Sequence, residues 1–491
     1  MSRTSESPPI VQYEDYSGKR HQIKGQWLIG ADGKMGIVRK HFLEPTAGIK
    51  QIDGLYPYTG TWIAANLHMT LPTPQSHPKF PLWELGYSPE DVYDLFWPVG
   101  WHFCSPPGKA TACGRFGPHK DRLWRHEFLH QVGTQDDSES ERLFWEHITP
   151  MITRDSDPAR GRVFAEPVQY PRDCIEILRC RPFRFVQKVV NQWFHKRTIL
   201  IGDAAHVYPP FAGQGIASGL RDAHQLAWRL TLLLKGDLDD IEREERILNA
   251  WALERRDCVD NAAKMSRLSG DLVNHQPSFL VFALTTIHTL FRSTPYLSGD
   301  MVAARERCGF SKVCGGFFLK THNGGVRMPQ IYVDSSAGTR HPVLSDCLLQ
   351  PTTSIFTVLV IGKGQDLSQK YQDAKAAVSA SGLLPAIVSE ESVVAYDIRE
   401  NPSVPILPDE DGISDSSRHH VPVVFSPASR ANIQGHLAPG YNKSCYVDRF
   451  GYDWFGSPNS FVIVRPDLFI FACAKTAAEL TNCLAMLKEF V

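Results

Sequence analysis

Residues 200–222 read LIGDAAHVYPPFAGQGIASGLRD, and this stretch decides the fold prediction. It begins with the end of a short, almost wholly apolar segment, residues 198–202, which is typical of a strand buried in a parallel sheet. Such a strand delivers Gly202-Asp203 to the C-terminal edge of the sheet, where open α/β sheets bind ligands. The Asp203 carboxylate would there accept hydrogen bonds from ligand hydroxyls. The stretch therefore predicts an α/β sheet with a ligand site at this turn.

The second half of the stretch predicts how a helix begins beside that site. Pro209-Pro210 fixes an extended turn and removes two backbone donors. Gly213-Gln214-Gly215 then lets the backbone approach a flat ligand closely as the helix starts at Ile216. The free N–H groups and the positive dipole end of a helix suit a partial negative charge. An ordinary strand–turn–helix with a glycine-rich connection is the plain alternative.

Periodicity predicts the elements around this turn. Apolar residues at steps of three and four predict a helix closed by Gly236; they are Ile216, Leu220, Ala223, Ala227, Leu230 and Leu234. Residues 240–275 are predicted as a charged helix with a solvated run at 242–246, and residues 279–308 as further helix. Residues 48–190 are rich in aromatics, proline and short alternating runs, which favours a mostly antiparallel sheet. A polar turn at 334–338 precedes a separate compact α/β unit.

A second candidate ligand turn lies near the start of the chain. Residues 28–39 read LIGADGKMGIVR, a strand ending in Gly-Ala-Asp-Gly and followed by a basic helical start. Asp32 would take part in a ribose or pyrophosphate-adjacent hydrogen bond through its neighbours, and Arg39 would meet a phosphate. The alternative is a turn with a solvated arginine.

Together the two stretches resemble the group A flavoprotein monooxygenases, the aromatic hydroxylase family that includes para-hydroxybenzoate hydroxylase, phenol hydroxylase and hydroxyphenylpropionate hydroxylase. Residues 29–39 look like the "DG" motif of that family, and residues 202–223 look like its "GD" motif. Further matches are residues 226–230, residues 254–256 and residues 464–467 before the last helix. Gly36, Ala217 and Gln225 stand where the family usually has Ser, Asn and Asn.

The resemblance implies a fold of mixed α/β and α+β class. The expected domains are an incomplete FAD-binding, glutathione-reductase-like domain with its DG motif in residues 1–47; a β-rich, mostly antiparallel substrate domain in 48–190; a continuation of the FAD-binding domain in 191–333; and a thioredoxin-like C-terminal domain in 334–491. In this scheme Asp203, Pro210, Gly213, Gln214, Gly215, Ile216, Asp32 and Arg39 would bind the cofactor.

The implied activity is hydroxylation of a small aromatic substrate, phenolic or of polyketide type as in secondary metabolism, with FAD, NAD(P)H and O₂. The family also opens with a Gly-x-Gly-x-x-Gly turn that holds the FAD pyrophosphate, and no such turn precedes Gly30. We therefore expect a chain that begins inside the flavin domain. The alternative is a catalytically silent remnant that acts only as a binding or dimerisation module, and a homodimer is compatible with either.

Composition excludes several other classes. The chain carries 52 basic and 53 acidic residues, a net charge of −1, so a general nucleic-acid binder is not expected. The 11 cysteines include no Cys-x-x-Cys pair, which favours a reduced, cytoplasmic setting. The longest mainly apolar stretch, residues 279–291, is too short to span a bilayer.

Individual polar and aromatic residues allow few assignments. Residues 119–130, HKDRLWRHEFLH, lack a believable ligand spacing and are predicted to be a solvated strand edge, so no metal site is expected. His206 is expected to hydrogen-bond its local turn, with catalysis as the alternative. The aromatic side chains of Tyr208, Tyr170 and Trp101, and His102, would line a substrate pocket or belong to the core. No general base is assigned.

Overall fold

The computed structural model describes residues 8–104, 109–130, 137–209, 213–236, 240–274, 286–287, 308–336, 342–349, 354–399, 423–429, 432–433, 454 and 458–491. Pro210 lies outside these residues, as does most of the helix expected over 279–308. The molecule is a mixed α/β structure with antiparallel sheets, as expected in outline. In the described part of the chain, no helix combines the length and the apolar character needed to cross a membrane.

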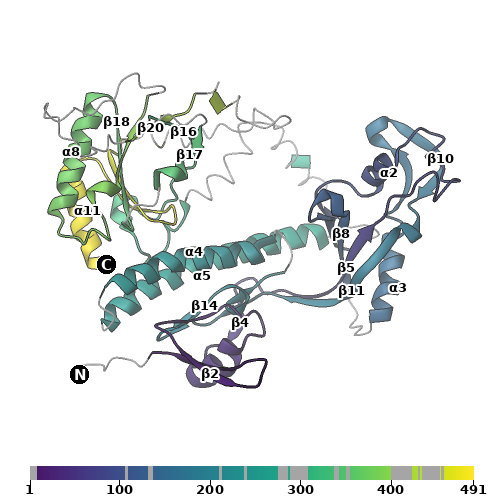
Figure 1. Cartoon of the computed structure of the whole chain (residues 1–491), viewed down its shortest axis with the longest axis horizontal. Helices are drawn as coiled ribbons and strands as arrows, with labels where there is room; N and C mark the ends of the chain where they lie inside the picture. The colour runs from purple at the N-terminus through teal and green to yellow at the C-terminus, as the bar shows by residue number, and fades with distance from the viewer. Residues whose placement is uncertain are drawn as a thin grey trace.

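Two long helices separate a β-rich unit from a C-terminal unit. Figure 1 shows α4 (Gln214–Lys235) and α5 (Ile241–Asn274) running across the middle of the molecule, with the β-rich unit at one end and the C-terminal sheet above the other end. The first strands of the chain lie beneath these helices. The helices and these strands share one apolar core with the C-terminal unit.

The strands beneath the helices include the predicted parallel pair. β3 (Leu28–Gly30) and β14 (Thr198–Leu200) lie side by side in parallel, and β13 (Phe194–His195) adds an antiparallel edge. A second small sheet has the order β15 (His206–Val207), β12 (Lys188–Val190) and β4 (Gln51–Asp53). β1 (Ile10–Glu14) and β2 (Arg20–Lys24) form an exposed hairpin.

The β-rich unit is built on an antiparallel sheet of five strands. Their order is β11 (Ile175–Val186), β5 (Thr59–Met69), β8 (Leu123–His130), β7 (Thr111–Phe116) and β6 (Trp101–Cys104). Helix α3 (Asp137–Ile148) packs Phe144 and Ile148 against one face of it. Helix α2 (Pro89–Phe96) and the pair β9 (Thr153–Asp157) and β10 (Arg162–Gln169) complete the unit.

Strand β8 corrects one expectation. Residues 119–130 were expected to be a solvated edge, but β8 is the central strand of the five, paired with β5 on one side and β7 on the other. His126 and Glu127 are buried there. The charges of the segment suggested exposure, yet His126 meets His147 of α3 and Glu127 meets Arg125 of the same strand.

The C-terminal unit contains a seven-stranded sheet covered by two helices. The strand order is β17 (Val343–Leu344), β16 (Tyr332–Ser335), β20 (Val424–Pro427), β19 (Val393–Asp397), β18 (Thr357–Gly362), β21 (Phe461–Val464) and β22 (Ile470–Ala474). Along β18, Val358 and Val360 face helices α8 (Gln365–Ala380) and α11 (Ala477–Phe490), whereas Leu359 and Ile361 face the opposite core. This alternation of two buried faces explains why the strand reads as one continuous apolar run.

Two helical expectations need correction in detail. Helix α4 forms as expected, but most of the apolar stripe that predicted it faces outward, with Ile216 82% and Leu220 68% exposed. The opposite face, with Leu226 and Leu232, is the one that packs, so the periodicity identified a helix without identifying its buried side. The run at 242–246 is likewise only partly solvated, because Arg243 and Glu244 are buried.

Candidate functional site

The two turns singled out in the sequence leave the same edge of the small parallel sheet. Leu200 of β14 is paired with Gly30 of β3, and the backbone N–H of Ile201 donates to the carbonyl of Gly30 at 3.0 Å. A Cβ atom at Gly30 would lie 2.7 Å from the Leu200 side chain. Glycine at position 30 therefore allows the strands to approach, and the pairing brings residues 30–33 beside residues 202–204.

The turn after β3 is closed by its own aspartate. Oδ2 of Asp32 accepts a hydrogen bond from the backbone N–H of Val38 at 2.9 Å, at the start of the helical turn Val38–Leu43. A Cβ atom at Gly36 would lie 2.0 Å from Oδ1 of Asp32. A serine at Gly36 would thus collide with the carboxylate, which gives a physical reason for this departure from the family pattern.

Arg39 connects this turn to the one after β14. Its buried guanidinium donates from Nε to the carbonyl of Ala204 at 3.0 Å, and Nη2 binds the carbonyl of Lys34. Burial lowers the pKa of Arg39, and the nearby carboxylates of Glu44 and Asp32 oppose that shift. In the structure this side chain fixes the backbone of both turns, and its phosphate contact stays a prediction.

The turn after β14 is held by a buried aspartate on α4. Gly202 has φ +59°, a backbone conformation that favours glycine, and its N–H donates to Oδ2 of Asp222 at 2.8 Å. The same oxygen is 2.7 Å from Nε2 of His206, and Oδ1 accepts from Nε of Arg255 at 2.6 Å. Although burial favours the protonated acid, the His206 hydrogen bond and Arg255 hold the pKa of Asp222 below its ordinary value. His206 therefore serves the local turn, as expected.

Asp203 and the start of α4 lie open beside this turn. The Asp203 side chain is exposed, while its carbonyl accepts from Nε2 of Gln51 at 2.9 Å. Gly213 has φ +60° at the first residue before α4, and a Cβ atom at Gly215 would meet no atom within 4 Å. Ile216 follows on the exposed face. In the described part of the chain, the space next to the α-carbons of Gly213 and Gly215 is therefore open.

A second buried network lies one residue away from the first along α5. Arg255 binds Asp222, whereas the preceding residue, Glu254, binds Arg229 at 2.6 Å and Arg465 at 2.8 Å. Asp467 completes this second group by accepting from Arg465 at 2.6 Å and from Nε1 of Trp228 at 3.1 Å. Two acids balance two arginines, all of them almost fully buried.

This network fastens the segment after β21 to α4 and α5. Burial lowers the pKa of Arg229 to about 10, and Glu254 opposes the shift. Several of these residues belong to the family motifs named above, but the sequence alone predicted no role for them. Their signal is a spacing: Asp222, Gln225 and Arg229 fall at steps of three and four, on the same face of α4 as Leu226 and Leu233.

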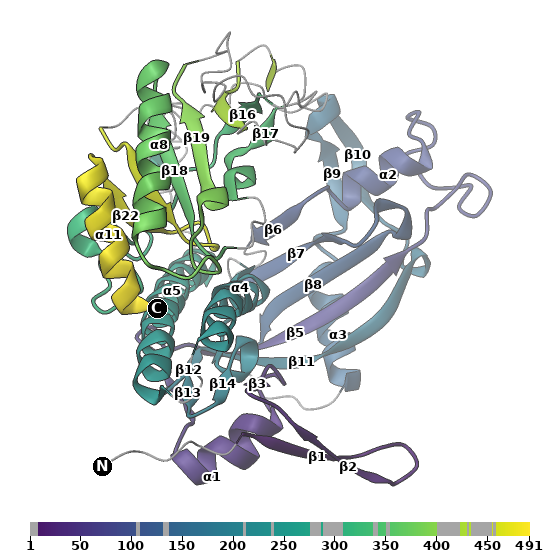
Figure 2. The same ribbon diagram turned by 60° about the vertical axis from the view of Figure 1, so that its left-hand side comes forward.

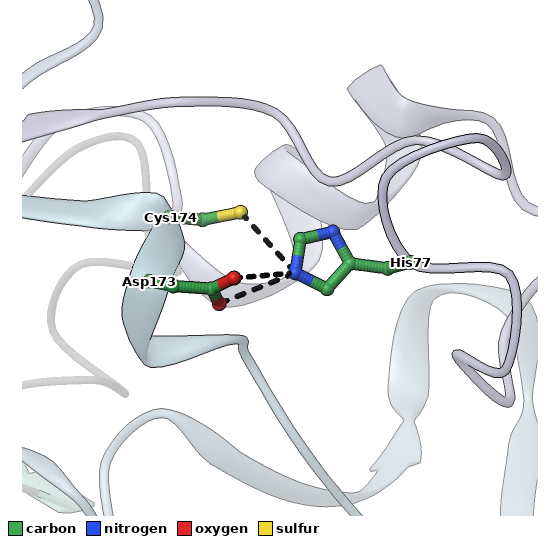
Figure 3. A group of neighbouring side chains, drawn as sticks. All are labelled: His77, Asp173 and Cys174. Atoms are coloured by element: carbon green, nitrogen blue, oxygen red, sulfur yellow. Dashed lines mark hydrogen bonds and ion pairs between the residues drawn. The ribbon is translucent and has the colours of Figure 1, made fainter.

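One group of metal-ligating side chains occurs elsewhere in the described residues. Figure 3 shows Nε2 of His77 pointing toward Asp173 and Cys174. Nε2 is 3.1 and 3.2 Å from the two carboxylate oxygens of Asp173 and 3.9 Å from Sγ of Cys174. The His–Asp distances are those of an ordinary hydrogen bond.

The aromatic residues considered for a substrate pocket divide between core and surface. Tyr170 and Tyr208 are buried, with Tyr170 donating its hydroxyl to the carbonyl of Thr70 at 2.7 Å. Burial raises the pKa of Tyr170. Trp101 on β6 is 45% exposed, and Nε2 of the neighbouring His102 is buried without a hydrogen-bond partner.

A family model described as "FAD binding domain" matches residues 4–266, more than half of the chain. The chain belongs to this FAD binding domain family. The matched part contains both turns, all of α4 and most of α5. The five-stranded sheet also falls within it.

Two curated proteins are similar in sequence to about half of this chain. A probable NADH-specific resorcinol 4-hydroxylase of Rhodococcus jostii (strain RHA1) is 27% identical over 233 residues, 47% of this chain and 34% of that protein. A 3-(3-hydroxy-phenyl)propionate/3-hydroxycinnamic acid hydroxylase of Shigella sonnei (strain Ss046) is 25% identical over 256 residues, 52% of this chain and 36% of that protein. The matched region spans about a third of the length of these relatives.

The fold of this FAD binding domain protein is also similar to a solved structure. The crystal structure of a ternary complex of aklavinone-11 hydroxylase with FAD and aklavinone aligns with a TM-score of 0.55 at 14% identity. The alignment covers 98% of this chain and 70% of that chain. The likeness therefore extends through the C-terminal unit, beyond the region matched by the family model.

Proposed function

We propose that this protein binds FAD and hydroxylates a small aromatic substrate, using NAD(P)H and O₂. The observation that carries the proposal is the junction of two turns at one sheet edge, joined by the bond between Arg39 and Ala204. The start of α4 lies beside the same edge, since Gly219 packs on Gly202. Ligands of open α/β sheets bind at such edges.

The residues at this edge fit the cofactor. The exposed Asp203 carboxylate is an acceptor for the ribityl hydroxyls of a flavin, and the open backbone at Gly213, Gln214, Gly215 and Ile216 would accommodate the flat ring. The N–H groups at the start of α4 favour negative charge on the pyrimidine side of the ring. Pro210 lies outside the described residues and stays a predicted cofactor contact. Asp32 and Arg39 would act by holding the backbone on the phosphate side.

FAD, once reduced by NAD(P)H, supplies the chemistry that activates O₂. The protein's own part is to hold the ring, to orient the substrate and to exclude water. We propose that the face of the five-stranded sheet away from α3 provides the substrate site. The named activities of the relatives on resorcinol and on 3-(3-hydroxy-phenyl)propionate support a phenolic substrate, and the aklavinone complex supports a polyketide type as well.

We also propose the domain division 1–47, 48–190, 191–333 and 334–491, with group A monooxygenase architecture. The order β19-β18-β21-β22 supports a thioredoxin-like C-terminal domain, because β18 and β19 are parallel with α8 between them and β21 and β22 form an antiparallel hairpin before α11. Without a Cys-x-x-Cys pair, this domain would serve packing or dimerisation.

The test is direct flavin binding followed by turnover. The purified chain is titrated with FAD, and bound flavin is measured by its absorbance and by quenching of its fluorescence. NADH and NADPH oxidation are then followed with a panel of phenols, and mass spectrometry detects a product that has gained one oxygen atom. Asp203→Asn is expected to weaken FAD binding about tenfold, the equivalent of one charge-assisted hydrogen bond.

Asp155→Asn, an exposed change on β9, is the matched control and is expected to bind FAD as the unchanged chain does. A chain that binds no FAD would refute the proposal. Bound FAD without NAD(P)H oxidation or product would instead favour the alternative, a module that binds but does not catalyse.

A further inference from the structure

One carboxylate oxygen in the centre of the β-rich unit, Oε2 of Glu127, accepts no hydrogen bond. Glu127 on β8 is 5% exposed, and its Oε1 accepts a hydrogen bond from Nε of Arg125 at 2.7 Å. Nη1 of Arg125 donates in turn to Oδ1 of Asn66 at 2.8 Å. Oε2 of Glu127 is buried and accepts no hydrogen bond. A buried carboxylate oxygen without a donor is costly, so it calls for a physical explanation.

The direction of this side chain follows from the alternation of the strand. His126 and Phe128, the neighbours of Glu127, belong to the face that packs on α3, where His126 contacts His147 and Phe128 contacts the same ring. Successive side chains of a strand point to opposite faces. Glu127 therefore belongs to the face away from α3. Figure 2 shows β6, β7, β8, β5 and β11 in this order, with β8 at the centre.

The nearest neighbours of Glu127 on that face are small and apolar. Directly across the strands lie Ala112 of β7 and Ala64 of β5, both small and both buried. One step along the strands lie Leu129 and Trp62, which face each other across β8 and β5. Residues directly opposite in antiparallel strands share a face and contact one another. The unpaired oxygen thus lies between two methyl side chains and beside an apolar, aromatic wall.

The other direction along the strands is polar. Arg125 and Asn66 face each other one step away from Glu127 on the same side of the sheet. Their hydrogen bonds hold Oε1, and Oε2 is the carboxylate oxygen without a donor. Two phenylalanines lie at the border of this face. Phe103 is opposite Ala112 and is 41% exposed. Phe183 is opposite Trp62 and is 44% exposed. An aromatic ring with one hydroxyl matches this combination of flat apolar surface and single acceptor.

We propose that Oε2 of Glu127 accepts a hydrogen bond from a hydroxyl group of the aromatic substrate and so positions the ring on this face of the sheet. The inference rests on the proposed function and deepens it, because it selects the substrate class. The group that meets Oε2 is a hydrogen-bond donor, such as a phenolic hydroxyl, and a substrate carboxylate is excluded from this point by like charge. Arg125 is a positioning residue that orients the carboxylate.

The test compares phenols with their methyl ethers on the FAD-loaded full chain. Resorcinol and 2-naphthol are the probes, 1,3-dimethoxybenzene and 2-methoxynaphthalene are their partners, and calorimetry measures binding. We expect the unchanged chain to bind at least one phenol about tenfold more tightly than its ether, as for a hydrogen bond to a charged group. Glu127→Ala is expected to abolish this difference, and Glu127→Gln to reduce it.

Thermal stability separates binding from a structural role. A residue needed for the fold would lower the melting temperature when replaced. Glu127→Gln keeps an acceptor for Arg125 and is expected to leave the melting temperature nearly unchanged. Glu166→Ala, an exposed change on β10, is the matched control and is expected to keep the discrimination.

Each other outcome has a distinct meaning. Discrimination retained in Glu127→Ala overturns the inference while the hydroxylase proposal stands, provided that FAD binds and product forms. An unchanged chain that binds FAD but neither phenol overturns the inference as well. Failure to bind FAD at all overturns the proposed function, and phenol binding by calorimetry then still decides the role of Glu127.

Discussion

The Nε atom of Arg39 and the carbonyl oxygen of Ala204 are 3.0 Å apart, although 165 positions separate the two residues along the chain. This hydrogen bond joins the turn after β3 to the turn after β14. The same guanidinium binds the carbonyl of Lys34. Because the side chain is buried, water does not replace these bonds when they are lost, so Arg39 adds to the strand pairing in fixing the relative position of the two turns.

Replacing Arg39 is therefore expected to affect both stability and cofactor binding. Arg39→Ala leaves the carbonyl of Lys34 without this donor and leaves the carbonyl of Ala204 only the 3.4 Å hydrogen bond from Nε2 of Gln51. We expect a cost of about 1–3 kcal/mol of unfolding free energy. The affinity for FAD falls at the same time, because the turn that carries Asp203 is no longer fixed. Urea unfolding and FAD titration measure the two effects.

Arg20→Ala is the control for Arg39, since the side chain of Arg20 is 90% exposed on the β1–β2 hairpin. It is expected to change neither quantity. If Arg39→Ala weakens neither stability nor FAD binding, the two turns are positioned by their strands alone.

Much of the fold follows from local sequence. The apolar run of β14, the glycine turn after it and the periodicity of α4 and α5 identify these elements because each depends on neighbours within a few residues. The C-terminal hairpin and its last helix follow in the same way. What local patterns leave open is burial: α4 carries apolar residues on two sides, and only the tertiary structure decides that Leu226 packs while Ile216 is exposed.

In the candidate site, too, features with a local sequence signature could be predicted, whereas contacts between distant positions could not. The glycines and Asp203 could be picked out because turns and helix starts have local signatures. The pairing of Asp222 with Arg255 could not, since it joins positions 33 residues apart on two helices. The burial of Glu127 could not be predicted for a similar reason, because a segment rich in charged residues suggests a solvated edge. Only the structure shows that Arg125 binds both Glu127 and Asn66 there.

The Asp222 carboxylate is expected to make stability depend on acid pH. Asp222→Asn leaves Arg255 as a buried charge without its counterion, at a cost of about 3–5 kcal/mol near neutral pH. The pKa of Asp222 in the folded protein is below its ordinary value of 3.8. Its contribution is therefore present above that value and is lost as the pH falls through the folded pKa. The stability gap between the two proteins should narrow on acidification below pH 3.8, as followed by urea unfolding.

Two buried histidines are expected to act in a different pH window. Burial lowers the pKa of His126 to about 3 and that of His147 to about 4, and repulsion between the rings adds to the shift of His126. The unfolded chain, with histidine pKa near 6.5, binds more protons between pH 6.5 and about 4. Stability should consequently decrease as the pH falls through this window.

His147→Phe tests this origin. Phenylalanine keeps the stacking on Phe128, whose ring lies 4.2 Å away at an interplanar angle of 3°, and it removes one of the two titrating rings. The slope of unfolding free energy against pH between 6.5 and 4 should become smaller. His41, exposed on the helical turn Val38–Leu43, offers the control His41→Phe, which should leave the slope in place. An unchanged slope in His147→Phe would assign the pH dependence to other groups.

Arg465 is expected to hold the C-terminal unit against the two central helices. It donates to Glu254 of α5 and to Asp467, and all three side chains are almost fully buried. Arg465→Met leaves two acids against the single charge of Arg229, so we expect a loss of about 3–5 kcal/mol. The double variant Arg465→Met, Asp467→Asn restores the balance of one acid to one arginine and keeps an acceptor for Trp228. The double variant should recover a substantial part of the lost unfolding free energy.

Arg142→Met is the control. It lies on the surface of α3 and is expected to cost less than about 1 kcal/mol of unfolding free energy. A double variant no more stable than the single one would mean that the contacts of Arg465, and not the charge balance, fix this unit in place.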